Sequence, residues 1–258
     1  MFQVLPQPIE DILRVLEYWD HILAGFLTTM ELYGGALVMG FFLGLLLALL
    51  RQYGGIILSR IATGYIEIIR GTPLLAQLFF IYFLPYSMNS ILEAQGLSPI
   101  PIGKWNIQTD IIILDRIITY TIFDHRMLVG LLTLGLNSAA YQAEYIRGAI
   151  KSVGTGQLLA AQSLGMSRLA AIRHVVLPQA LRRVIPAWSN EAAYLPKYTV
   201  VVFFIGVVDL FGEAHFIVAN TFRTLTTYVF IALIFLALIT IVSKALDFIH
   251  KRTSIPGV

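Results

Sequence analysis

The chain has 258 residues, of which 57% are apolar and only 13% are charged. Its mean hydropathy is +0.77, so a membrane protein is the expected class. No cysteine is present, which excludes disulfide bonds, thiol catalysis and cysteine-ligated metals, and the net charge of +3 does not by itself indicate a nucleic-acid partner.

Residues 1–23 are expected to contain an amphipathic helix that lies at the membrane interface. Ile9, Ile12, Leu13 and Leu16 recur at helical spacing beside charged residues. A disordered polar tail is the alternative. The segment is acidic and lacks a continuous apolar region before a small-residue cleavage site, so we expect no cleavable signal peptide.

Apolar runs of about 20 residues, enough to cross roughly 30 Å of hydrocarbon as a helix, predict the membrane spans. Four are clear in the sequence: residues 32–50, 71–92, 127–143 and 224–243. A fifth, residues 187–208, contains Glu191 and Lys197, and we include it because its second half is apolar and the topology requires it. The sequence therefore predicts an all-α membrane protein with five transmembrane helices in one permease domain, residues 24–247, followed by a tail, residues 248–258.

The distribution of charge predicts the orientation. Six Arg and Lys residues and no acidic residue lie between Ile146 and Pro186. By the positive-inside rule, the loop of residues 149–184 and the basic tail face the cytoplasm. The acidic N-terminus and the connection of residues 87–126 belong outside, so we expect the N-terminus outside and the C-terminus inside.

The outer connection, residues 87–126, is unusually long. Residues 107–123 within it are apolar but interrupted by Asp110, Asp115 and Arg116, which predicts an interfacial or loop-packed helix rather than a sixth span. Two prolines and a glycine before this segment indicate an ordered turn region: Pro99, Pro101 and Gly103.

The cytoplasmic loop carries the most specific motif of the chain. It reads Gly156-Gln-Leu-Leu-Ala-Ala-Gln-Ser-Leu-Gly165-Met-Ser-Arg168 and is followed by Val175-Val-Leu-Pro178. The alanines permit close helix approach, and Gly165 supports a sharp turn between two short helices. A helix cannot continue through Pro178 in its interior without strain. The motif resembles the signature loop of ABC-importer permeases, in which Glu-Ala-Ala is followed by Gly four positions after the second Ala. Leu159 stands where that family has Glu.

This resemblance implies that the loop is a coupling helix that docks on an ATPase subunit. An ordinary cytoplasmic hairpin is the alternative. The residues assigned to coupling are Leu159, Ala160, Ala161, Gly165, Ser167, Arg168 and Pro178.

Two further segments resemble the polar amino-acid branch of the same permeases. They read Ile69-Arg-Gly-Thr-Pro-Leu and Asn137-Ser-Ala-Ala-Tyr-Gln-Ala-Glu-Tyr-Ile-Arg-Gly148. Later positions also match, although Tyr198 and Val200 stand where the branch commonly has Asp and Ser. The resemblance covers most of residues 19–210 and implies an amino acid as the solute.

Charged groups inside spans are costly and are therefore candidate functional residues. Glu67 and Arg70, and likewise Glu144 and Arg147, are three positions apart, which allows ion pairs on one helix face. Snorkelling or subunit docking is the alternative for these pairs, as are interhelical hydrogen bonds for the polar residues of the third span. The predicted substrate path consists of Arg70, Gly71, Thr72, Pro73, Asn137, Tyr141, Glu144, Glu191 and Lys197.

The chain itself is not expected to be an enzyme or to bind a cofactor or metal, because residues 154–157 lack the Gly-Lys-Ser/Thr ending of a phosphate-binding loop. The resemblance implies two separate ABC ATPase subunits that bind ATP and Mg, and a second permease chain, identical or related. It also implies an extracytoplasmic solute-binding protein and a multi-pass location in a prokaryotic cytoplasmic (inner) membrane. The same architecture carrying another small polar solute, an ion-coupled secondary transporter and an intramembrane enzyme are the alternatives. The last two are disfavoured by the lack of internal repeats and of a catalytic constellation.

Overall fold

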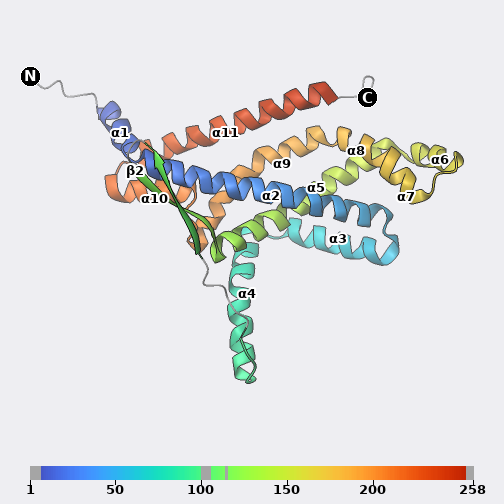
Figure 1. Ribbon diagram of the computed structural model, residues 1–258, viewed down its shortest axis with the longest axis horizontal. Coiled ribbons are helices and arrows are strands. Elements are labelled where there is room, and N and C mark those ends of the chain that lie inside the picture. Colours follow the sequence, from blue (N-terminus) through green and yellow to red (C-terminus); the bar gives the residue numbers. More distant parts are fainter. Residues whose placement is uncertain (1–6, 100–105, 114–115, 254–258) are drawn as a thin grey trace, which may run out of the picture. The chain divides into compact units, whose positions relative to one another are not determined.

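The computed structural model describes residues 7–99, 106–113 and 116–253 (Figure 1). The chain divides into two compact units, each made of three segments. Unit 1 comprises Met1–Gly35, Pro73–Leu134 and Pro196–Leu238, and unit 2 comprises Ala36–Thr72, Gly135–Leu195 and Ile239–Val258.

Long helices dominate the described residues. They are α2 (Trp19–Tyr53), α3 (Gly55–Gly71), α4 (Leu74–Ala94), α5 (His125–Val153), α9 (Ile185–Tyr198) and α11 (Thr224–Thr253). Among the described residues, three single helices are long and apolar enough to cross a membrane: α2, α4 and α11. A fourth span results if α9 and the 3₁₀ segment η2 (Thr199–Ile205) are joined to α10 (Leu210–Thr221) across a bend of 57°.

Helix α5 has 29 residues but is not among these apolar spans. Its polar side chains explain why, since Asn137, Gln142, Glu144 and Arg147 all lie on it. The count of five spans and the orientation of the chain therefore stay predictions.

Residues 107–113 and 116–123 form strands and not a helix, so the predicted interfacial helix is wrong. The all-α class applies only to the rest of the described chain. Strands β1 (Asn106–Ile113) and β2 (Arg116–Asp124) pair as an antiparallel hairpin. The reason is composition, because Ile, Thr, Tyr and Phe dominate both strands and favour extended backbone. Asp110 faces Thr119 across the strands, where the Thr119 hydroxyl donates to the Asp110 carboxylate at 2.9 Å. Pro101, Gly103 and Asp115 lie outside the described residues.

In unit 1 the hairpin is fixed to the first part of α2. The Arg116 guanidinium lies 3.1 Å from the Asp20 carboxylate and donates to the Glu17 carbonyl at 2.9 Å. The Tyr120 hydroxyl donates to the Glu31 carboxylate. Burial, together with this hydrogen bond, raises the pKa of Tyr120, so the phenol remains a donor at neutral pH.

The apolar core of unit 1 joins α1 (Gln7–Leu16), α2, α10 and α11. Its buried residues are Val15, Ile22, Leu210, Ala214, Ile217 and Ile231. Val15 is buried, whereas the four apolar residues predicted to meet the membrane interface remain exposed: Ile9, Ile12, Leu13 and Leu16. The placement of α1 at the interface stays a prediction.

Unit 2 is built around α5. Ala139 and Ala143 pack against α2 and α3, and small side chains at these positions let the helices approach closely. The C-terminal half of α5 packs against α2 and against residues 172–184; the buried residues there are Ala48, Ile146, Ala149, Ile150, Val153, Val176, Ala180 and Val184.

Candidate functional site

The segment predicted to couple to an ATPase forms a compact group of short helices in unit 2 (Figure 1). These are α6 (Thr155–Ser163), α7 (Arg168–Ala171), the π-helical η1 (Ile172–Val176) and α8 (Leu177–Arg183). Gly165 has a φ of +87° in the turn between α6 and α7, a conformation that glycine adopts without steric cost. The Ser167 hydroxyl caps α7 by accepting the Ala170 N–H at 3.3 Å.

Pro178 does not end this segment, because α7, η1 and α8 follow one another without a break. It lies in the first turn of α8, directly after the π-helical residues, where the Leu177 N–H donates to the Ile172 carbonyl five positions back. A proline clashes with the carbonyl four residues earlier in a regular helix, and the wider π turn removes that conflict.

Helices α6 and α7 and the turn between them present apolar side chains to the surface. Leu159, Leu164 and Leu169 are 61%, 86% and 75% exposed. Ala161 is buried and Ala160 is exposed. The guanidinium of Arg168 lies 5.9 Å from the centre of the Tyr53 ring. Leu159 lies in α6, Leu164 in the turn and Leu169 in α7, and exposed apolar side chains on neighbouring short elements are typical of a surface that another protein covers.

Glu191 of α9, a predicted substrate-path residue, lies in a buried hydrogen-bond network in unit 2. Its carboxylate accepts the Ser138 hydroxyl at 2.6 Å, and the Ser138 hydroxyl accepts the Gln142 amide at 3.0 Å. The Gln142 side chain also donates to the Leu37 carbonyl at 3.2 Å and accepts the Trp188 indole N–H at 2.7 Å. The network therefore connects α2, α5 and α9, and its central side chains, Ser138, Gln142 and Glu191, are buried.

A second cluster of charges in unit 2 contains Glu144. Its carboxylate contacts Arg147 at 2.5 Å, as the spacing of three positions predicts, and also contacts Arg51. Glu67 differs from the prediction because its partner is Arg51, at 3.3 Å, rather than Arg70. The Arg70 guanidinium instead lies 5.2 Å from the centre of the Tyr141 ring, so two predicted path residues contact each other there.

The remaining predicted path residues are placed as follows. Asn137 is buried on α5. Gly71 ends α3, and the Thr72 hydroxyl donates back to the Ile68 carbonyl at 2.8 Å. Pro73 immediately precedes α4, so the chain leaves the helical conformation between α3 and α4. Pro73 and Lys197 belong to unit 1, whereas the other predicted path residues belong to unit 2.

Sequence reasoning missed the partners of Glu191. Ser138, Gln142 and Trp188 were recognisable only as polar or aromatic residues within apolar segments. It also missed the role of Asp209 in unit 1, whose buried carboxylate accepts the Gly212 N–H at 3.0 Å and the Thr199 hydroxyl at 3.3 Å. An Asp just before an apolar helix is the N-cap signal that identifies it.

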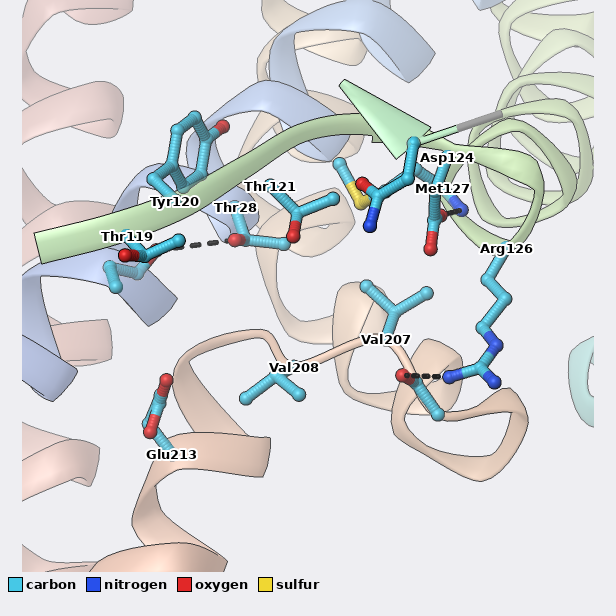
Figure 2. Close-up of a pocket in the computed structure, with 13 residues that line it drawn as sticks. Thr28, Thr119, Tyr120, Thr121, Asp124, Arg126, Met127, Val207, Val208 and Glu213 are labelled. Carbon is cyan, nitrogen blue, oxygen red and sulfur yellow. Dashed lines mark hydrogen bonds between the residues drawn. The ribbon is translucent and has the colours of Figure 1, made fainter. Parts of the chain in front are cut away.

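A polar pocket of about 350 Å³ lies in unit 1 beneath the β-hairpin (Figure 2). Strand β2 supplies Thr119, Thr121 and Asp124, the start of α5 supplies Arg126, and the first turn of α10 supplies Glu213. The hairpin that forms one wall was predicted as a helix, so the sequence alone did not indicate this pocket.

No group of three or more His, Asp or Glu side chains is arranged to hold a metal ion within residues 7–99, 106–113 and 116–253. The charged groups of these sites are engaged with one another and with backbone groups. They can hold a polar solute or transmit a change of shape, but they form no recognisable catalytic constellation.

Comparison with known proteins assigns the family. Residues 40–255 match the family of binding-protein-dependent transport system inner membrane components. The nopaline transport system permease protein of Agrobacterium fabrum is 32% identical over 91% of this chain and 88% of its own length. The glutamine transport system permease protein of Escherichia coli is 33% identical over 84% of this chain and 85% of its own.

Solved structures agree with this assignment. A crystal structure of an amino acid ABC transporter with histidines matches with a TM-score of 0.72 and 32% identity, covering 93% of this chain and 98% of that one. An inward-facing methionine ABC transporter shares the fold, with a TM-score of 0.57 at 20% identity over 97% of this chain and all of that one. The chain belongs to the family of binding-protein-dependent transport system inner membrane components.

Proposed function

We propose that this chain is the permease subunit of an ATP-driven ABC importer and forms, with a second permease chain, the path along which amino acids cross the membrane. The observation that carries the proposal is the similarity to nopaline and glutamine permeases over more than four fifths of the chain. The similar solved structure of an amino acid ABC transporter supports the same solute class.

The energy source is proposed to lie on partner subunits. Two ABC ATPase subunits bind ATP and Mg, and the turn between α6 and α7 docks on one of them. The exposed leucines and the glycine turn support this role. Leu159, where the family has Glu, then makes an apolar contact instead of a charged one.

The chain is proposed to lie in the prokaryotic cytoplasmic membrane, with five spans, the N-terminus outside and the C-terminus inside. The helices α2, α4 and α11 and the bent α9–α10 pair support three or four of these spans. The excess of basic residues between Ile146 and Pro186 supports a cytoplasmic coupling loop. A solute-binding protein outside delivers the amino acid.

The solute is proposed to meet Glu191 on its way through unit 2. A zwitterion that leaves water must replace its hydration shell with fixed polar groups, because an unsatisfied charge in a low-dielectric environment costs several kcal/mol or more. Glu191 offers a carboxylate for the ammonium group, and Ser138 and Gln142 hold that carboxylate in position. Arg70 of α3 and Tyr141 of α5, which contact each other, are further candidates.

The test is uptake by proteoliposomes that contain the permease, its ATPase and its solute-binding protein. Labelled amino acids, a sugar and an oligopeptide are offered separately, with ATP or a non-hydrolysable analogue inside the vesicles. We expect ATP-dependent uptake of at least one amino acid and no uptake with the analogue. Uptake of the sugar or the peptide alone would contradict the amino-acid assignment, and uptake driven by an ion gradient without ATP would contradict the importer class.

A further inference from the structure

The pocket beneath the β-hairpin carries opposite charges on different elements of unit 1. Figure 2 shows Arg126 on one side and Glu213 on the other, with Val207 and Val208 between them in this view. The hydroxyls of Thr28, Thr119 and Thr121 also line it. Its volume of about 350 Å³ falls within the range of roughly 300–1,000 Å³ that is usual for small-molecule sites.

The Arg126 side of the pocket depends on a glycine. The Arg126 guanidinium donates to the Gly206 carbonyl at 3.2 Å. A Cβ at position 206 would lie 2.9 Å from the same guanidinium nitrogen, and Gly206 has a φ of +81°. Because this hydrogen bond uses one of five guanidinium N–H donors, the side chain is held in place while retaining donors for an anion.

The Glu213 side depends on a second glycine. A Cβ at position 25 would lie 2.8 Å from Cγ of Glu213, so Gly25 leaves the space that this side chain occupies. His21 Nδ1 contacts one carboxylate oxygen of Glu213 at 2.9 Å, and the His21 ring stacks on Phe216. The carboxylate is thus fixed at the pocket wall, and a carboxylate can accept several hydrogen bonds at once.

The other carboxylate of the pocket does not neutralise Arg126. Asp124 accepts the Met127 N–H at 2.7 Å and thereby caps the start of α5. Within the described part of the chain, no ion pair joins Asp124 to Arg126. The guanidinium therefore keeps its charge available to a ligand.

We infer that this pocket is a second solute site, distinct from the region around Glu191, that binds the zwitterionic end of an α-amino acid. Arg126 binds the carboxylate, and Glu213 binds the ammonium group. The threonine hydroxyls complete the hydrogen bonds, and Val207 and Val208 contact the apolar part of the ligand. This inference rests on the proposed function, since it makes the pocket an outer station for the amino acid that the importer carries.

A smaller pocket of about 260 Å³ adjoins this site and shares Ala24, Thr119 and Glu213 with it. Asp20 and His21 line the smaller pocket. The side chain of a bound amino acid has room to extend there, beside the Asp20–Arg116 ion pair and the His21–Glu213 contact.

Equilibrium dialysis tests this site on the permease–ATPase complex in lipid nanodiscs without solute-binding protein. A mixture of isotope-labelled standard amino acids identifies the best ligand. The corresponding amine lacks the carboxylate, and the corresponding deaminated acid lacks the ammonium group. Their affinities therefore show how much each end of the amino acid contributes to binding. For the wild type, we expect the amine to bind at least about tenfold more weakly than the amino acid, which corresponds to about 1.4 kcal/mol.

The variants assign each end of the ligand to a residue. In Arg126→Gln the amino acid should bind no better than the amine, and in Glu213→Gln no better than the deaminated acid. Arg223→Gln and Glu17→Gln are matched controls, because both residues form ion pairs elsewhere in unit 1 and should leave binding unchanged. Val208→Trp fills the pocket from an exposed position, so it should abolish binding even if a charge variant fails to fold.

Two outcomes would overturn the inference. One is that no labelled amino acid is retained by the wild type at millimolar concentration. The other is retention that Val208→Trp and the two charge variants leave unchanged. Uptake by the same preparation with its binding protein tests the proposed function separately, so a complex that imports an amino acid without using this pocket refutes only the second site.

Discussion

Glu191 shows at the scale of one residue what sequence can and cannot predict. A carboxylate within an apolar segment stands out as functional or paired, and the sequence therefore indicates the residue. Its donor Ser138 lies 53 positions away, and nothing in the local pattern selects that serine over its neighbours. The same limit explains Glu67, because the spacing of three permits a pair with Arg70 but the fold brings Arg51 to it instead.

We predict that Glu191→Ala weakens the apparent affinity for the imported amino acid about tenfold or more, since a lost charged partner costs roughly 1.5–3 kcal/mol. Asn137→Ala, on the same part of α5 as Ser138, should also weaken it. Uptake and substrate-stimulated ATPase activity of the reconstituted complex measure the effect.

Ser138→Ala is the control for a purely structural role of Glu191. It removes the hydrogen bond that positions the carboxylate but leaves the carboxylate itself, so it should lower the free energy of unfolding by about 1–3 kcal/mol and weaken the affinity less than Glu191→Ala does. If Ser138→Ala and Glu191→Ala lose stability equally and affinity is unchanged in both, the central site is misplaced.

Gly165 acts through its backbone. A Cβ there would contact nothing within 4 Å, so any penalty for substitution comes from the φ of +87° and not from crowding. We predict that Gly165→Val destabilises the turn by roughly 1–2 kcal/mol or more, because side chains disfavour the left-handed region and branched ones most. Uptake and ATPase coupling should fall, while the chain still inserts into the membrane.

The matched control is Gly156→Val, in α6, where a Cβ also meets nothing within 4 Å and φ is not positive. It should retain transport. Wild-type uptake and coupling in Gly165→Val would show that the turn does not transmit the action of the ATPase.

The β-hairpin is the element that sequence reasoning assigned incorrectly. Apolar residues interrupted by Asp110, Asp115 and Arg116 fit an amphipathic helix as well as a strand pair, and periodicity alone could not decide between them. The density of β-branched residues on both strands was the stronger signal. The long helices were predictable because continuous apolar runs admit few other structures in a membrane.

We predict that Tyr120→Phe loosens the hairpin from α2. The substitution removes the donor to Glu31 and leaves a partly buried carboxylate without it, at a cost of about 1–3 kcal/mol. Amide hydrogen exchange in β1 and β2 should accelerate. Tyr86→Phe serves as the control, because the Tyr86 ring is exposed and contacts Tyr82 and His125 through its faces and edges. Equal exchange rates in wild type and Tyr120→Phe would show that the Glu31 contact does not anchor the hairpin.

At the scale of the whole chain, the sequence predicts the family more readily than it predicts the number of membrane spans. The family assignment follows from motifs spread along the sequence. The number of spans does not, because α5 and α9 carry the polar residues that we propose for the solute path and are less apolar for that reason. The helices that we propose for the solute path are therefore the ones that hydropathy identifies least well.

Single cysteines placed before and after these helices test the topology, and the native chain contains none. Ile112 on β1 precedes α5, Gln162 in α6 follows it, and Asn220 at the end of α10 follows the bent pair; all three are exposed. We predict that a membrane-impermeant maleimide labels Ile112→Cys and Asn220→Cys in intact cells and labels Gln162→Cys only after permeabilisation. Gln162 is preferable to Ser167, whose hydroxyl caps α7. Because α5 is the only long helix between Ile112 and α6, labelling of both Ile112→Cys and Gln162→Cys from the same side would show that α5 does not cross the membrane. Protection of Asn220→Cys together with Gln162→Cys would instead make the α9–α10 pair re-entrant and leave the chain with four spans.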